Sequence, residues 1–312
     1  MTVGAGVALA LGVLALPSPD EEPALVSRYL QPLTVTAGGT ARFDLPLTNT
    51  GTTAAHGAVL VIDSPGVTTT YRNCSPVGDH LVCTFGTTLK AGAVYGLSAP
   101  LAFRAPADSI TGSVLHAGVT WYTPAQYAAN PVFVPKPGET YVWVATPPAA
   151  LWGDAPELTL KEIVDPPADP PEDDPWDEFE PALEITVTDG RPADLTVTAT
   201  RTPAAAGSGV VRVSLANHGP GRLYPDLYAN NRPSIVMLFP KGTDSTTDVA
   251  GCYRFAGYRT VECDWADHLT VPVRVTDPEA GAGRVAIVSH SGRTLDLEDP
   301  DRANNAAPIV AG

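Results

Sequence analysis

Short runs of alternating apolar and polar residues occupy most of the chain from residue 25 onward. In the segment TARFDLPLTNTG, the residues Phe43, Leu45 and Leu47 fall on one face, and an Asn-x-Gly turn ends the run. The segment GVVRVSLANHGPG follows the same arrangement. A period of two residues is typical of a half-buried antiparallel strand. No sustained apolar stripe with the roughly 3.6-residue period of a helix appears. We therefore predict an all-β fold with little helix.

The sequence contains an internal repeat: the same series of segments occurs twice along the chain. After each Asn-x-Gly turn, at Asn49 and Asn217, the chain continues with an apolar strand, a cysteine pair and a further strand. Such self-similarity is the signature of tandem structural units. We therefore predict two modules, over residues 26–189 and 190–312, with the junction at residues 189–194.

Two segments of the first copy depart from the repeat. Residues 124–155 have no counterpart in the second copy, and we interpret them as an insertion. Residues 165–181, DPPADPPEDDPWDEFEP, hold eight carboxylates and six prolines without a positive charge. Aligning LTLKEI with TLDLED, and ALEITV with AAPIVA, predicts that this stretch is the loop of the first module's terminal hairpin rather than a linker.

The N-terminus carries the apolar run VGAGVALALGVLAL at residues 3–16. This run is shorter than the roughly 20 residues that cross a membrane, and it fits the apolar region of a secretory signal. The first basic residue is Arg28, so a positively charged leader region is missing, and a buried strand is the alternative. We expect residues 1–25 to be a signal peptide or exported segment, with no transmembrane segment after it.

Charge excludes two classes of partner. The net charge is −15, from 19 Lys and Arg against 34 Asp and Glu. Nucleic-acid binding needs a basic footprint, and an anionic membrane surface also attracts basic segments. We therefore expect neither partner. Apolar residues make up 44% of the chain, which is enough to bury a core.

The cysteines form two short-range pairs, one in each copy: Cys74 with Cys83, and Cys252 with Cys263. In a chain with an export signal, this pattern predicts two structural disulfides, each bracketing the turn of a hairpin. A zinc site is the alternative, because His80 lies inside the first pair. Zinc sites use closer cysteine spacing, and a redox site would need a C-x-x-C motif, which is absent.

The sequence shows no catalytic constellation. It contains no G-x-S-x-G, no H-E-x-x-H and no Gly-rich phosphate loop after a strand. The segment Ser289-His290-Ser291 has no recognisable partner motif, so a strand-end histidine is the preferred interpretation. We predict that the protein is not an enzyme.

Carboxylates in two loops are the candidate metal ligands. Calcium takes six to eight oxygen ligands, and Asp-rich loops supply them. The spacing is irregular and lacks the EF-hand pattern, so a solvated loop is the preferred interpretation and calcium the alternative cofactor. The candidate ligands are Glu172, Asp173, Asp174, Asp177, Asp299 and Asp301.

Aromatic residues in the insertion and the acidic loop are the candidate ligand-binding residues. Exposed aromatics often mark protein or sugar recognition, since they bury much area at small entropic cost. Core packing is the preferred interpretation for the insertion, because the segment around Tyr141 and Trp143 alternates like a strand, and ligand recognition is the alternative. The candidates are Tyr141, Trp143, Trp152 and Trp176.

Several motifs together resemble a known family. These are DLTVTAT at residues 194–200, the turns LTNTG and LANHGPG, the cysteine pairs, KAG at residues 90–92 and DPDRANNAA at residues 299–307. Each copy resembles the immunoglobulin-like conserved-repeat modules of bacterial surface proteins and the related bacterial cell-adhesion domain. The resemblance implies two tandem immunoglobulin-like β-sandwiches of about seven strands each.

The resemblance also implies a role. Such modules act as stalks or adhesive segments of exported proteins, so we expect a non-catalytic structural or adhesive module, secreted or attached at the bacterial cell surface. The alternative is a carbohydrate- or calcium-binding module that uses the aromatic insertion and the acidic loop. We expect the partner to be an extracellular protein or polysaccharide, and the chain to be monomeric.

Overall fold

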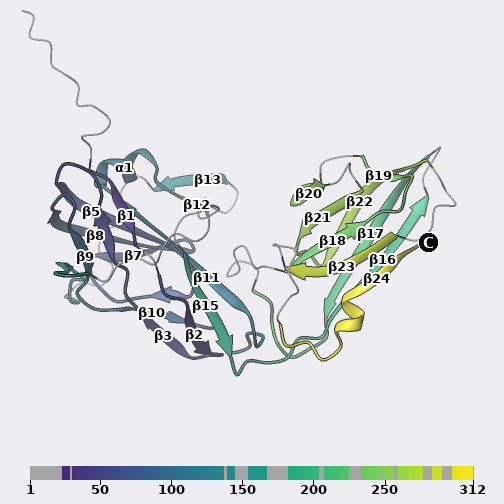
Figure 1. Cartoon of the computed structure of the whole chain (residues 1–312), viewed down its shortest axis with the longest axis horizontal. Coiled ribbons are helices and arrows are strands. Elements are labelled where there is room, and N and C mark those ends of the chain that lie inside the picture. Colours follow the sequence, from purple (N-terminus) through teal and green to yellow (C-terminus); the bar gives the residue numbers. More distant parts are fainter. Residues whose placement is uncertain are drawn as a thin grey trace, which may run out of the picture.

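The computed structural model has an all-β fold, which confirms the predicted fold class. Figure 1 shows two lobes, which we call the first lobe (residues 23–188) and the second lobe (residues 189–311). Helical elements are short among the described residues. No described helix has the length and apolar character needed to cross a membrane. The structure describes residues 23–28, 30–136, 139–144, 154–166, 182–203, 207–224, 233–246, 249–255, 259–276, 283–289 and 297–311.

Three sheets of the first lobe enclose one hydrophobic core. A six-stranded sheet has the order β2-β15-β11-β5-β8-β7, and it faces a four-stranded sheet (β1-β4-β9-β14) and a three-stranded sheet (β3-β10-β6). The strands of these sheets are β1 (Leu25–Ser27), β2 (Leu33–Thr36), β3 (Thr40–Phe43), β4 (Leu47–Asn49), β5 (Ala55–Asp63), β6 (Val67–Thr68), β7 (Cys74–Val77), β8 (His80–Leu89), β9 (Val94–Leu97), β10 (Leu101–Arg104), β11 (Val114–Tyr122), β14 (Leu160–Glu162) and β15 (Ala182–Thr188).

Buried and partly exposed residues alternate along β11, and this alternation shows why these strands form. Its odd-numbered residues, Leu115, Ala117, Val119 and Trp121, are buried in the core, and the residues between them are partly exposed. The opposite faces of a strand therefore meet different surroundings, as a period of two requires. The neighbouring β5 is buried on both faces from Ala58 to Ile62, so a further layer covers its outer side.

That further layer comes from the predicted insertion. It contains α1 (Pro124–Ala129) and the hairpin of β12 (Val132–Lys136) and β13 (Glu139–Val144). A capping box starts α1: the Thr123 hydroxyl accepts from the Gln126 amide at 3.2 Å, and the Gln126 side chain accepts from the Thr123 amide at 2.8 Å. Tyr127 is buried in a small cluster with valines of β5 and β8. Its ring belongs to a core and is not a surface aromatic.

The acidic stretch 165–181 does not close a hairpin, contrary to the prediction. The strand before it, β14, pairs with β9, whereas the strand after it, β15, pairs with β11 and β2. Among the described strands, β14 and β15 belong to different sheets. The chain therefore crosses from one layer to the other here, because β15 takes β11 as its antiparallel neighbour. Residues 167–181 themselves lie outside the described residues.

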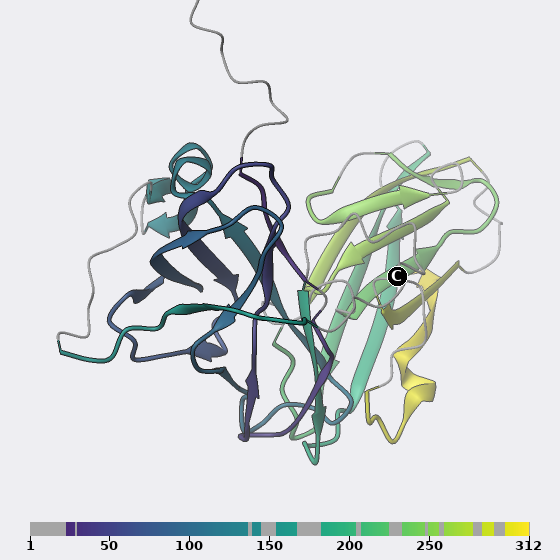
Figure 2. The same cartoon turned by 60° about the vertical axis from the view of Figure 1, so that its left-hand side comes forward.

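One continuous nine-stranded sheet forms the second lobe. Its order is β19-β22-β17-β16-β24-β23-β18-β21-β20, and it curls around one hydrophobic cluster into a near-barrel. Figure 2 shows this lobe from a second direction. The elements are β16 (Leu195–Pro203), β17 (Ser208–Asn217), β18 (Pro233–Leu238), β19 (Thr243–Ser245), β20 (Cys252–Phe255), β21 (Thr260–Asp264), β22 (His268–Val275), β23 (Gly283–Ser289), η3 (Arg302–Asn305) and β24 (Ala306–Ala311).

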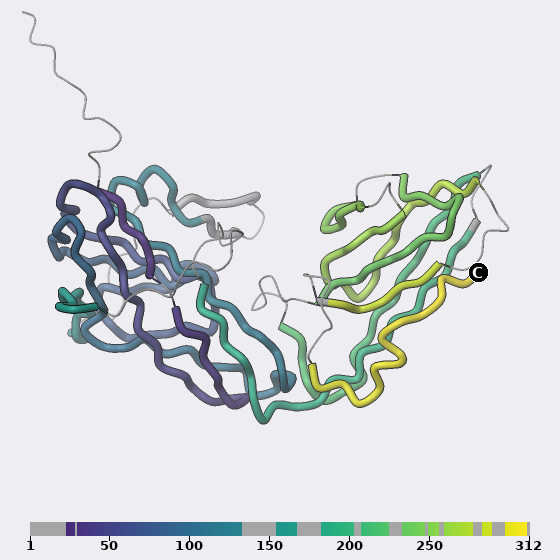
Figure 3. Tube along the Cα trace, viewed as in Figure 1, coloured from purple at the N-terminus to yellow at the C-terminus, as the bar shows by residue number. Residues whose placement is uncertain are grey.

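Strand β16 joins the two halves of this sheet. It pairs antiparallel with β17 on one side and parallel with β24 on the other. The first lobe has a related pairing, in which its early strand β2 runs parallel to its last strand β15. In each lobe the last strand therefore lies beside a strand from the beginning of the same lobe. The Cα trace in Figure 3 follows the single passage from the first lobe into the second.

Candidate functional site: the junction between the lobes

The loop between β10 and β11 carries a side chain into the core of the other lobe. This loop, residues 105–113, belongs to the first lobe by sequence, yet its Ile110 is fully buried in the hydrophobic cluster of the second lobe. Burying a side chain of this size stabilises the folded state by about 1.5–3 kcal/mol. The second core is therefore completed by a residue that precedes it by about 80 positions in the chain.

Backbone hydrogen bonds hold this loop against the junction segment. The amide of Arg191 donates to the carbonyl of Ser109 at 2.9 Å, and the amide of Thr111 donates back to the carbonyl of Arg191 at 3.1 Å. Two parallel bridges, Ser109 with Arg222 and Ile110 with Arg191, fix the register. The loop thus pairs with the second lobe much as a short strand would, which aligns Ile110 with its site.

A third segment of the second lobe also reaches this loop. The amide of Glu298 donates to the carbonyl of Thr111 at 3.0 Å, and the carbonyl of Glu298 accepts from the amide of Ala193 at 2.7 Å. The loop is therefore bonded to residues before β16, after β17 and before η3. Contacts with three separate segments restrict rotation of one lobe relative to the other.

Residues of the second lobe contact the first lobe in return. Leu223 packs against both hydrophobic cores, and Tyr224 packs against the first. The Tyr224 hydroxyl donates a hydrogen bond to the Asp108 carboxylate. The guanidinium of Arg222 lies over the Tyr224 ring, 5.2 Å from its centre, a cation–π contact. Each lobe therefore supplies a side chain that packs against the hydrophobic core of the other.

The hydrogen bond between Tyr224 and Asp108 changes the acidity of both groups. It is the main cause that lowers the pKa of Asp108, and the nearby cations of Arg222 and Arg191 act in the same direction. The pKa of Tyr224 is raised, first by burial and then by the Asp108 carboxylate. Near neutral pH the phenol is a donor and the carboxylate an acceptor, so the contact is charge-assisted.

Close approach at the junction requires glycine. A Cβ on Gly221 would lie 2.6 Å from Cγ1 of Ile110, and a Cβ on Gly190 would lie 2.5 Å from the carbonyl oxygen of Ser109. Real Cβ contacts are not this short, so any side chain here would push the loop away. Gly190 belongs to the junction DGRPAD that the sequence predicts.

Two asparagines hold equivalent turns next to the start of each lobe. The Asn49 side-chain oxygen accepts from the amides of Ala24 and Gly51, both at 3.2 Å. The Asn217 oxygen accepts from the amides of Asp194 and Gly219, at 3.0 and 3.1 Å. Each amide nitrogen in turn donates to a backbone carbonyl on its own turn. Both turns therefore tie an entering chain segment to the end of a strand.

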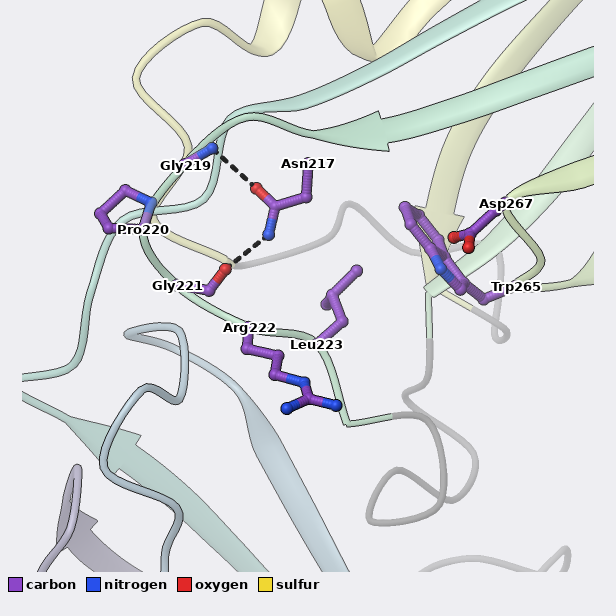
Figure 4. Close-up of a pocket in the computed structure, with 8 residues that line it drawn as sticks. All are labelled: Asn217, Gly219, Pro220, Gly221, Arg222, Leu223, Trp265 and Asp267. Atoms are coloured by element: carbon purple, nitrogen blue, oxygen red, sulfur yellow. Dashed lines mark hydrogen bonds between the residues drawn. The ribbon is translucent and has the colours of Figure 1, made fainter.

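A pocket of about 440 Å³ lies beside the Asn217 turn. Figure 4 shows that one wall is this turn and the segment after it, with Arg222 and Leu223, and that the other carries Trp265 and Asp267. The second wall is the connection between β21 and β22. The sequence singled out the Asn217 turn as a strand end, but it pointed to none of the side chains Arg222, Leu223, Trp265 and Asp267.

The cysteines lie as the sequence predicts. Cys74 is the direct cross-strand neighbour of Cys83 on β7 and β8, and Cys252 that of Cys263 on β20 and β21. The two members of each pair are at disulfide distance, with Cα atoms 4.0 Å apart. His80 instead contacts Asp63, with 3.3 Å between Nδ1 and the carboxylate. This geometry favours the disulfide over the alternative zinc site.

Of the six candidate calcium ligands, the structure describes Asp299 and Asp301. The Asp299 carboxylate is almost fully buried and accepts from the amides of Leu195 and Asp301, both at 3.1 Å, and from the Asn305 side chain at 3.0 Å. It therefore secures the start of β16. Within the described part of the chain, no three His, Cys, Asp or Glu residues are placed to hold a metal ion. Glu172, Asp173, Asp174 and Asp177 lie outside the described residues.

The candidate aromatic residues are only partly covered by the structure. Tyr141 and Trp143 lie on β13, which pairs with β12 in the two-stranded hairpin. Trp152 and Trp176 lie outside the described residues, as does His290 of the Ser-His-Ser segment. Recognition by these four aromatics stays a prediction.

Comparisons with known proteins add little. No family model and no curated protein matches the chain. Among solved structures, the chain is similar to the adhesin InvE of Yersinia pseudotuberculosis, at 14% identity and a TM-score of 0.26. The aligned region covers 94% of this chain and 61% of that one. A TM-score this low carries no argument about role, so the case for function rests on the chain's own geometry.

Proposed function

We propose that the chain is a non-catalytic structural or adhesive module that works outside the bacterial cell. In this proposal its two lobes are tandem immunoglobulin-like units related by an internal repeat. The all-β fold, the matching asparagine turns and the parallel pairing of early and last strands in each lobe support it. The two cysteine pairs support an oxidising location, since disulfides persist in exported proteins.

The burial of Ile110 in the opposite lobe is the observation that carries the proposal. Adjacent domains in one chain are expected to move relative to each other unless their interface is large and hydrophobic. Here backbone pairing and exchanged side chains replace a free linker. A stalk or adhesive segment needs such a rigid connection between its lobes, because it must present a distant surface in a set direction.

Single-molecule FRET between the lobes tests this rigidity. Dyes attached through unnatural amino acids at Asp79 and Lys241, both exposed turn residues, leave the cysteines intact. We expect one narrow distance population, broadened by Ile110→Ala. The matched control Val164→Ala, at a side chain that is 82% exposed, is expected to leave the distribution unchanged. A broad distribution in the unaltered chain would contradict a rigid stalk.

Cell fractionation tests the location. When the full chain is expressed with its own N-terminus in a bacterium, we expect it in the medium or on the cell surface. We also expect the exported chain to be folded, as its melting profile would show. We expect no catalytic turnover of generic ester, glycoside and peptide substrates by this folded chain. Retention of oxidised, folded chain in the cytoplasm would contradict export while leaving the rigidity result intact.

A further inference from the structure

We propose that the pocket beside the Asn217 turn binds a neutral glycosyl unit of an extracellular polysaccharide. This inference builds on the adhesive role by naming a partner class for one specific site. Its volume of about 440 Å³ is in the range of small-molecule pockets, which is roughly 300–1,000 Å³. Four side chains around it have complementary chemistry: Arg222, Leu223, Trp265 and Asp267.

Trp265 supplies a flat apolar surface. Its indole is partly buried against the second core, so part of the ring is held in place and part is left at the pocket. The C–H face of a pyranose ring packs on such a surface, and a tryptophan contributes a large contact area at small entropic cost. Leu223, which packs against both cores, extends the apolar part of the pocket from the opposite wall.

Arg222 and Asp267 supply hydrogen-bonding groups, Arg222 on one wall of the pocket and Asp267 beside Trp265 on the other. A guanidinium only donates and a carboxylate only accepts, so together they match vicinal hydroxyls, which do both. The Arg222 guanidinium is already positioned by its contact with the Tyr224 ring, which reduces the entropy lost on binding.

Both walls of the pocket are held by hydrogen bonds to backbone carbonyls. Asn217 donates from its side-chain nitrogen to the Gly221 carbonyl at 2.6 Å, which shapes the turn (Figure 4). On the other wall, the Asp267 carbonyl accepts from the Leu215 amide at 2.9 Å. The site is therefore preformed rather than assembled by the ligand.

Charge selects a neutral ligand over an acidic one. The pocket lining holds one cation, Arg222, and one carboxylate, Asp267, and the chain as a whole carries a net charge of −15. A polyanionic glycan would approach against this field, whereas a neutral, hydroxyl-rich ring meets no such barrier. The mixed lining also disfavours a purely apolar ligand, because such a ligand would remove water from the two charged groups without offering them hydrogen bonds.

A glycan array followed by calorimetry tests the proposal on the full chain. The probes are neutral cello-, xylo-, galacto- and chito-oligosaccharides, with sulfated and uronic-acid oligosaccharides for comparison. We expect binding to at least one neutral probe, weakened at least tenfold by Trp265→Ala and by Asp267→Ala. Trp265→Phe, which keeps a flat ring, is expected to lose less. Tyr253→Ala removes an exposed aromatic from β20, outside the pocket lining, and is the matched control.

Three results would overturn the proposal: no neutral probe binds, acidic probes bind equally well, or Trp265→Ala and Asp267→Ala bind as the unaltered chain does. If Trp265→Ala lowers the melting temperature, its loss of binding could come from unfolding. The test then rests on Asp267→Ala, because Asp267 is exposed and its substitution leaves the core intact. The FRET experiment measures lobe rigidity and not binding, so either proposal can fail while the other stands.

Discussion

The hydroxyl of Tyr224 donates a hydrogen bond to the carboxylate of Asp108 across the junction between the lobes, although the two residues are 116 positions apart in the chain. The same contact is the main cause that lowers the pKa of Asp108, and it adds to burial, the larger cause, in raising the pKa of Tyr224. It joins the loop that carries Ile110 to the segment that carries Leu223. The junction is therefore fastened by both apolar packing and a charge-assisted hydrogen bond.

This contact predicts how stability depends on pH. The folded-state pKa of Asp108 is below its ordinary value of 3.8, so its contribution is complete above that pH and is lost as pH falls through the folded-state pKa. Tyr224 has a pKa above its ordinary 10.0, so its contribution is lost as pH rises through that higher value. We expect Tyr224→Phe to cost about 1 kcal/mol at neutral pH.

Melting temperatures between pH 3 and 7 check this prediction. The difference between the unaltered chain and Tyr224→Phe is expected to shrink toward pH 3. Tyr253→Phe, at an exposed tyrosine, is the control. A constant difference over the whole range would show that the carboxylate does not take part.

Gly221→Ala is expected to disrupt the junction. The added methyl group would meet Ile110 Cγ1 at 2.6 Å and the Arg191 carbonyl oxygen at 2.9 Å, so the loop must move. Overpacking of this kind costs about 1–3 kcal/mol. Chemical denaturation measures the loss. Gly86→Ala is the matched control, because nothing lies within 4 Å of its added Cβ; an equal effect of both variants would contradict the close approach.

Asn49→Asp is expected to destabilise the first lobe strongly. The Asn49 side chain is fully buried, and its nitrogen donates to the carbonyls of Thr53 and Leu89 at 2.8 and 3.1 Å. An aspartate cannot make these donations and adds a buried charge. Each carbonyl left without a donor costs about 1–3 kcal/mol. Asn130→Asp, at an exposed helix end, provides the comparison in thermal unfolding, and equal effects would speak against the buried turn.

The two cysteine pairs are expected to be oxidised and to differ in accessibility. The partners are 9 and 11 positions apart in the chain, and closing such loops stabilises the fold by about 2.5–3 kcal/mol on the chain-entropy model. Cys74, Cys83 and Cys263 are buried, whereas Cys252 is partly exposed. A mild reductant should therefore open the second pair first, since exchange requires access to a sulfur.

Thiol titration under denaturing conditions, before and after reduction, checks the oxidation state. Mass mapping after alkylation identifies the pair that opens first. Four free thiols in exported material would rule out both disulfides. Equal opening rates would contradict only the difference in accessibility.

His116 is expected to make the first lobe less stable in mild acid. Burial lowers its pKa below the ordinary 6.5, although the nearby carboxylates of Glu184 and Asp63 oppose this shift. The unfolded chain then binds the proton more readily, so stability is complete above about pH 6.5 and falls as pH drops through the lower folded-state pKa.

His116→Gln should flatten the stability profile between pH 7 and 5. His56→Gln, at an exposed histidine of the same sheet, is the control. Denaturant midpoints measured across this range provide the test. A profile that keeps its slope in His116→Gln would assign the pH dependence to other groups.

Local sequence patterns determined the strands and the cysteine pairing. The period-two alternation around Leu45 and Val213 predicts inward-facing side chains, and both residues are buried. Val213 lies on β17 as predicted, whereas Leu45 lies between β3 and β4, where the chain passes from one sheet to another. Cysteines that bracket a hairpin turn must face each other when the hairpin closes, so their pairing is also a local matter. The Asn-x-Gly turns are equally local, because Asn49 and Asn217 accept from the amide two residues onward.

Tertiary structure alone decided the order of the strands and the nature of the junction. Sequence alignment made β14 and β15 a hairpin, but pairing depends on which edge each strand reaches, and β15 pairs with β11. Ile110 is a single apolar residue in the polar loop DSITGS, a pattern equally common on surfaces. Its burial depends on a core built by residues far along the chain, so no local pattern could reveal it. Short-range periodicity thus specifies strands, whereas contacts between distant segments unite the lobes and form the pocket beside them.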